Sequence, residues 1–160
     1  MKKNRIIKIE SSLDEMFQVE QFVEEISGEY LLYGSYFGNI LMAVSEAVKN
    51  AIIHGNRQDR KKYVRIMLKN TREGIWISVA DEGDGFDHDV YIGKRNSGIG
   101  LGSEKNGLYL IQALADEVNF KENGCIIEML FRINGIEESI FERRISFMQD
   151  FFRVYQHLNS

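Results

Sequence analysis

Residues 81–86 read Asp-Glu-Gly-Asp-Gly-Phe and directly follow Ile75–Ala80, an apolar run with the pattern of a β-strand. The carboxylate of Asp81 could accept a hydrogen bond from an exocyclic amine of a ligand. Gly83 and Gly85 have no Cβ atom, so the backbone there could approach a flat ring closely. Taken alone, the same residues also fit an ordinary turn after a strand.

A second polar set lies on Tyr36–His54, a segment whose periodicity predicts a helix. Glu46, Asn50 and His54 are spaced four residues apart, so they share one helix face, nearly opposite the apolar stripe. The amide oxygen of Asn50 suits Mg²⁺ that also carries substrate phosphates. Glu46 could take a proton from a hydroxyl or water that attacks a γ-phosphate. A solvated helix face is the alternative interpretation.

A third segment, His88–Asn106, is rich in glycine and has little periodicity, which is typical of a lid or a disordered loop. The next segment, Gly107–Ala115, is predicted to be a helix that begins at Gly107 without a side-chain cap. Its free N–H groups and positive dipole end would favour a phosphate. For Gly98-x-Gly100-x-Gly102, a flexible linker is the competing interpretation.

The periodicity also predicts the elements that must position these residues. The expected strands are Arg5–Glu10, Tyr63–Asn70, Ile75–Ala80, Val118–Lys121 and Cys125–Ile133. The expected helices are Leu13–Ser27, Tyr36–His54, Gly107–Ala115 and Ile136–Leu158. Ser12 and Glu15 fit a capping box before the first helix. Turn residues at Thr71–Gly74 and at Asn123-Gly124 predict two antiparallel hairpins.

Composition favours one globular domain, with 44% apolar and 28% charged residues. The net charge of -4 gives no general attraction to nucleic acid. No apolar run approaches the ~20 residues of a membrane span, and the basic start is not followed by a signal-peptide core. Cys125 is the only cysteine, which excludes an intrachain disulfide and indicates a buried, inert thiol. We therefore expect a cytoplasmic protein without nucleic-acid or membrane partners.

Together and in this order, the three segments resemble the motifs of the GHKL ATPases, which include DNA gyrase, histidine kinases and MutL. Glu46-Ala-Val-Lys-Asn50-Ala-Ile-Ile-His54-Gly55 resembles their N box, and Asp81–Phe86 resembles their G1 box. Gly107–Val118 is similar to the segment after their final glycine motif. The pattern Glu-Ala-x-x-Asn-Ala-x-x-His-Gly is closest to small serine/threonine kinases that act as bacterial anti-sigma factors. The resemblance covers about Arg5–Ile133.

The resemblance implies an α+β fold of the Bergerat type. This fold is a two-layer α/β sandwich, with a mixed, mostly antiparallel sheet covered by helices on one face. The nucleotide would lie between the helical layer and the lid. Residues 1–134 would form the histidine kinase-like ATP-binding domain, and residues 135–160 a C-terminal helical extension.

Carried over residue by residue, the resemblance makes Asn50 a ligand of Mg²⁺ between the phosphates of ATP, and Glu46 the catalytic base. Asp81 would accept a hydrogen bond from the adenine amino group, with Gly83 and Gly85 beside the base. Further nucleotide-binding residues implied by the resemblance are Lys105, Asn106, Gly107 and Leu108.

The implied function is a Mg-ATP-dependent serine/threonine protein kinase that regulates transcription. It would sequester a client such as a sigma factor and phosphorylate a small antagonist protein. The family often has Gly-Arg-Gly where this chain has Lys105-Asn106-Gly107, and a lysine lacks the forked geometry of arginine. This departure keeps two alternatives open: a non-catalytic, nucleotide-dependent protein-binding module, or a chain that has lost nucleotide binding.

The last predicted helix, Ile136–Leu158, is too apolar to be exposed on all sides. One alternative is a homodimer interface through Phe141, Met148, Phe152 and Tyr155. The other is packing against the helix's own domain. The sequence favours neither.

Overall fold

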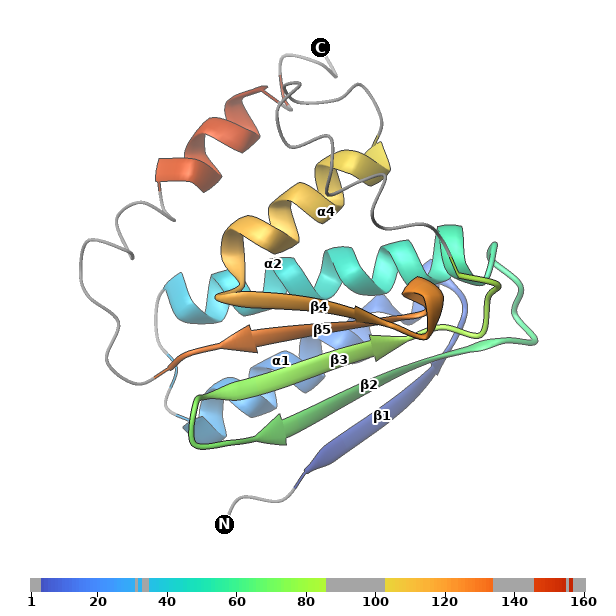
Figure 1. The fold of residues 1–160 in the computed structure, drawn as a ribbon, viewed down its shortest axis with the longest axis horizontal. Helices are drawn as coiled ribbons and strands as arrows, with labels where there is room; N and C mark the ends of the chain where they lie inside the picture. The colour runs from blue at the N-terminus through green and yellow to red at the C-terminus, as the bar shows by residue number, and fades with distance from the viewer. Residues whose placement is uncertain are drawn as a thin grey trace.

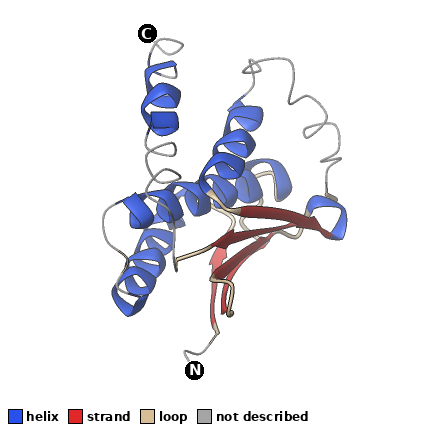
Figure 2. Ribbon diagram, turned by 60° about the vertical axis from the view of Figure 1, so that its left-hand side comes forward, coloured by secondary structure: helices blue, strands red, loops and turns tan. Residues whose placement is uncertain are grey.

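The computed structural model describes residues 4–30, 32, 35–85, 103–133, 146–154 and 156. Five strands form one sheet, and they are β1 (Arg5–Glu10), β2 (Tyr63–Asn70), β3 (Ile75–Ala80), β4 (Glu117–Lys121) and β5 (Ile126–Phe131). Their order is β1-β2-β3-β5-β4, and all four pairings between these strands are antiparallel. Helices cover one face of the sheet (Figures 1 and 2), which confirms the expected two-layer α/β sandwich.

The first three strands have the predicted bounds, because each alternates between buried and outward-facing residues with a period of two. The prediction for β5 was too long. Cys125 has αR dihedral angles and ends η3 (Glu122–Gly124), so it lies outside the strand. After the strand, the backbone N–H of Arg132 donates to the side chain of Asp116 at 2.7 Å rather than to a neighbouring strand.

The described helical elements are η1 (Leu13–Glu15), α1 (Met16–Tyr30), α2 (Ser35–Asn50), η2 (Ala51–Gly55) and α4 (Ser103–Leu114), together with η3 and a helix at residues 146–154. The predicted capping box at Ser12 and Glu15 is wrong. The Ser12 hydroxyl accepts from the Asp14 backbone N–H at 3.2 Å, while the Ser12 N–H donates to the carbonyl of Glu10. The first helical segment therefore begins as a 3₁₀ turn, η1, and α1 starts only at Met16.

The predicted start of the third helix also needs correction, because α4 begins at Ser103 and not at Gly107. Residues 103–106 are Ser-Glu-Lys-Asn, and without apolar residues they gave the periodicity nothing to detect. Gly107 is therefore the fifth residue of a helix rather than its open end. The rest of the predicted loop, residues 88–102, lies outside the described residues.

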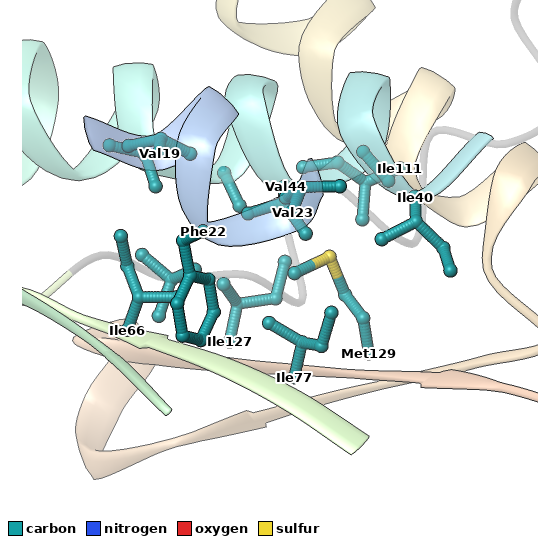
Figure 3. Packing of buried hydrophobic residues seen from close by; sticks show 14 of the residues in the cluster. Val19, Phe22, Val23, Ile40, Val44, Ile66, Ile77, Ile111, Ile127 and Met129 are labelled. Atoms are coloured by element: carbon teal, nitrogen blue, oxygen red, sulfur yellow. The ribbon is translucent and has the colours of Figure 1, made fainter. Parts of the chain in front are cut away.

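The core lies between the sheet and the helices. Figure 3 shows side chains of the sheet, such as Ile77 and Met129, directed toward Phe22 of α1, Val44 of α2 and Ile111 of α4. All five are buried, with at most 3% of their surface exposed. This packing joins α2, α4 and the central strands into one unit, which fixes the side chains at their ends.

Residues 146–154 are helical, as expected for part of Ile136–Leu158, and the remainder of that prediction lies mostly outside the described residues. Phe147, Met148 and Phe151 pack against the core, and the ring centroids of Phe147 and Tyr109 in α4 are 5.1 Å apart. The described part of this helix thus contacts its own domain. The division at residue 134 stays a prediction. No helix among the described residues is long and apolar enough to cross a membrane.

Candidate functional site

A cavity with an empty volume of about 670 Å³ lies between the helical layer and one end of the sheet. Four predicted site residues line it, and they come from α2, the loop after β3, and α4: Asn50, Asp81, Gly85 and Leu108. The fold thus brings together residues that are far apart in the sequence.

Asp81 directly follows β3 and is fixed by backbone hydrogen bonds. Its N–H donates to the carbonyl of Cys125 at 2.9 Å, and its Oδ1 accepts from the N–H of Gly83 at 2.8 Å. Burial raises the pKa of the Asp81 carboxyl, and the Gly83 hydrogen bond, the Cys125 side chain and the charge of Lys62 oppose this rise. The result is a partly desolvated acceptor at the cavity wall.

The end of η2 packs against this carboxylate. A Cβ atom at Gly55 would overlap the carboxylate of Asp81, and one at Gly83 would overlap the carbonyl oxygen of Gly55. Gly85 adopts a left-handed φ of 84°, and a Cβ there would overlap the carbonyl of Asn123. The missing Cβ atoms of Gly83 and Gly85 therefore permit close contact between backbone segments, while the place of these glycines beside a ring stays a prediction.

Glu46 and Asn50 meet α4 at Gly107. A Cβ atom at Gly107 would lie 3.0 Å from Oε2 of Glu46 and 3.3 Å from Nδ2 of Asn50. Glu46 also forms an ion pair with Lys49 at 3.3 Å. The polar row was predicted to lie nearly opposite the apolar stripe of the helix. This is wrong for Asn50, which lines the same cavity as Ala47 and Ala51 of that stripe.

The oxygen atoms of Asn50 and Glu46 are donors that could hold Mg²⁺. This ion commonly takes one or two protein oxygens together with phosphate oxygens and water. Among the described residues, no group of three or more His, Cys, Asp or Glu side chains could hold a metal ion by itself. The backbone of Lys105 and Asn106 is part of α4, and the structure does not describe their side chains.

Two residues at the site were not predicted as site residues. Asn56 is fully buried, and its only signal in the sequence is an amide directly after the helix-ending Gly55. Cys125 was expected to be buried and inert within a strand, but it is partly exposed and lines the cavity. Its thiol donates to the carbonyl of Gly83 at 3.2 Å, and burial, followed by the Asp81 charge, raises its pKa.

Fold and cavity define a two-layer α/β domain with a cavity between its helices and one end of its sheet. A family model described as the histidine kinase-like ATPase domain matches residues 9–131, and the chain belongs to this family. Membership implies ATP binding and confirms the Bergerat-type fold expected from the three motifs.

Two relatives with sequences similar to this chain are named serine-protein kinases. Serine-protein kinase RsbW of Staphylococcus aureus (strain MSSA476) is 33% identical over 115 residues, which cover 65% of this chain and 72% of that protein. Serine-protein kinase RsbW of Bacillus subtilis (strain 168) is 32% identical over 108 residues, covering 61% and 65% of the two chains.

A crystal structure of RsbU and RsbW domains from Mycobacterium tuberculosis has a similar fold, with a TM-score of 0.59 and 21% sequence identity. The similarity covers 82% of this chain but only 32% of that longer chain. At this identity, the likeness supports the fold alone.

Proposed function

We propose that this chain is a Mg-ATP-dependent serine/threonine protein kinase of the anti-sigma-factor type. The observation that carries the proposal is the arrangement of the cavity. Asp81 lies at the end of β3, while Glu46 and Asn50 lie together where α2 meets Gly107 of α4. A nucleotide with its base at Asp81 and its phosphates at Asn50 would contact both groups.

At the base end, the Asp81 carboxylate accepts a hydrogen bond from the adenine amino group. The apolar wall that would pack against the ring is formed by Val79, Ile111, Phe120 and Ile127. This wall excludes water, so the single polar contact at Asp81 has a large influence on which base is bound. Gly83 and Gly85 keep side chains out of the plane of the ring.

At the phosphate end, Asn50 would hold Mg²⁺ together with the phosphates, and the ion would neutralise their negative charge when bound. Glu46 accepts the proton of the attacking serine or threonine hydroxyl. The hydroxyl oxygen forms a bond to the γ-phosphorus as the bond between that phosphorus and the β,γ-bridging oxygen of ATP breaks, and ADP leaves with this oxygen. Lys49, which pairs with Glu46 at 3.3 Å, helps to orient the carboxylate.

Relatives that are named serine-protein kinases support a protein substrate for this reaction. The proposed substrate is a small antagonist protein with a serine or threonine hydroxyl. The proposed client is a sigma factor or a similar protein, which the kinase sequesters in the cytoplasm. Lys105 in the first turns of α4 would supply positive charge near the phosphates, in place of the arginine common in the family.

Transfer of labelled phosphate tests the proposal. The chain is incubated with γ-labelled ATP, Mg²⁺ and candidate antagonist proteins encoded beside it. We expect label on a serine or threonine of the antagonist.

Glu46→Gln should slow transfer about a hundredfold or more, because it removes the base. Glu20→Gln, on the exposed side of α1, is the matched control and should transfer as fast as wild type. Equal rates for Glu46→Gln and wild type would refute the assignment of Glu46.

A non-catalytic, nucleotide-dependent binding module is the second candidate. The sequence Lys105-Asn106-Gly107 favours it, since the forked arginine of the family is missing there. This candidate predicts that ATP and the partner bind but that no label moves. Sustained phosphorylation of the partner would exclude it.

A further inference from the structure

Asn56 is a buried polar residue that the proposed reaction does not use. None of its surface is exposed, and it directly follows η2, where its backbone N–H donates to the carbonyl of Ala51 at 2.8 Å. Both ends of its side-chain amide are engaged. Oδ1 accepts from the backbone N–H of Glu82 at 2.8 Å, and Nδ2 donates to the carbonyl of Tyr63 at 2.9 Å.

These contacts close a ring of three residues. The carboxylate of Glu82 accepts from the backbone N–H of Tyr63, so each member contacts the other two. Asn56 follows the helical layer, Tyr63 begins β2, and Glu82 follows β3. The amide of Asn56 therefore joins the end of η2 to the loop that carries Asp81.

The position of the loop decides where Asp81 can meet a ligand. Asp81 immediately precedes Glu82, and its carboxylate packs against the backbone of Gly55, the neighbour of Asn56. Asn50 is the last residue of α2, and η2 continues this helix to Gly55. Fixing the loop to the end of η2 therefore also fixes Asp81 relative to Asn50. Two groups that are held in place before binding lose less conformational entropy when a ligand contacts both.

We propose that Asn56 is a positioning residue for nucleotide binding, which holds the Asp81 loop in register with the helix that bears Asn50. The inference rests on the proposed binding of ATP across Asp81 and Asn50, but not on phosphoryl transfer. A purely structural amide would contribute to stability and leave the affinity for ATP unchanged in the folded protein.

The first test compares two buried asparagines of the full-length chain. Asn56→Ala removes the amide at the site, while Asn39→Ala removes a side chain in α2 that is 5% exposed and does not line the cavity. Calorimetry measures the dissociation constant for Mg-ATP, and thermal melting without ligand measures stability. We expect Asn56→Ala to raise the dissociation constant about tenfold and Asn39→Ala to leave it within about twofold of wild type.

The second test separates affinity from stability. Asn56→Asp keeps an oxygen to accept from Glu82 but loses the donor to Tyr63 and buries a carboxylate, which should lower the melting temperature below that of Asn56→Ala. We nevertheless expect it to bind ATP more tightly than Asn56→Ala. Affinities that follow the order of melting temperatures would overturn the proposal. If one variant does not fold, the dissociation constant of the other decides: a value within about twofold of wild type overturns the proposal.

The outcomes distinguish this inference from the proposed function. A wild-type chain that binds ATP without transferring phosphate refutes the kinase, while the dissociation constants still test Asn56. A wild-type chain that transfers phosphate, with Asn56→Ala binding ATP equally well, refutes the role of Asn56 alone. A wild-type chain that does not bind ATP overturns both.

Discussion

At the scale of single residues, the site contains a carboxylate, Asp81, whose burial disfavours its charged form. Burial raises the pKa of Asp81, although hydrogen bonds from Gly83 and Cys125 and the charge of Lys62 oppose the rise. A carboxyl that binds its proton more tightly when folded than when unfolded reduces stability once it is ionised. A side chain that lowers stability in this way fits a role in binding a ligand better than a role in folding.

Asp81→Asn should therefore stabilise the ligand-free protein at neutral pH. Above the raised pKa the wild-type side chain is ionised and partly desolvated, and the amide avoids that cost. The advantage should shrink as the pH falls through the raised pKa toward the ordinary aspartate value, because wild-type Asp81 then becomes protonated. Melting temperatures at pH 7 and at mildly acidic pH measure the effect.

The same variant should lose the rise in melting temperature that ATP gives to wild type, since an amide presents a different pattern of donors and acceptors to the adenine edge. A ligand-free Asp81→Asn protein that melts below wild type at neutral pH would contradict the account of its burial. An undiminished ATP-induced rise would contradict the proposed role in base recognition.

At the scale of elements, α2 and η2 form one continuous helical segment on which the site is assembled. This segment carries Glu46 and Asn50, ends at Gly55, and is followed by Asn56. A π-helical turn such as η2 is often found at functional sites, and here it brings the backbone of Gly55 against Asp81. A substitution inside α2 should therefore change the stability of the helix without changing the contacts that Gly55 and Asn56 make at its end.

Gly38→Ala tests that separation. Gly38 lies within α2, and a Cβ atom there would meet nothing within 4 Å. Alanine should raise the free energy of unfolding by about 0.5–1 kcal/mol, because glycine is the poorer helix former. Urea denaturation measures the gain, and the affinity for ATP should not change. A destabilised variant would show that Gly38 has a role other than helix formation.

At the scale of the whole molecule, the helix at residues 146–154 adds to the layer that carries the site. Phe147, Met148 and Phe151 pack against the core, whereas 43% of Phe152 is exposed. Of the residues predicted to form a homodimer interface, Met148 thus contacts its own domain. The homodimer itself stays a prediction.

Phe147→Ala should lower the free energy of unfolding by about 2 kcal/mol, less than a fully buried phenylalanine because the side chain is only partly buried. Phe152→Ala, the same substitution on the same helix, should cost less than about 0.5 kcal/mol. Urea denaturation of both variants measures the difference. Equal losses would show that the contact between Phe147 and Tyr109 does not stabilise the domain.

The sequence by itself determined the features that depend on neighbouring residues. The bounds of β1, β2 and β3 were predicted correctly, since burial on one face of a strand produces alternation within a few residues. The order of the three motifs indicated the family, which the match over residues 9–131 confirms. Asp81 and Asn50 were recognised through these motifs, and the structure places both at one cavity.

Only the tertiary structure decided how these segments meet. Asn56 joins residues 7 and 26 positions away in sequence, and its amide carries no local pattern that would reveal either contact. The sequence predicted a helix up to His54, but the contact of the next residue, Gly55, with Asp81 depends on how a helix end and a strand end approach each other. Cys125 lines the cavity because η3 turns the chain there. Such contacts between distant segments arise from packing, which local periodicity does not encode.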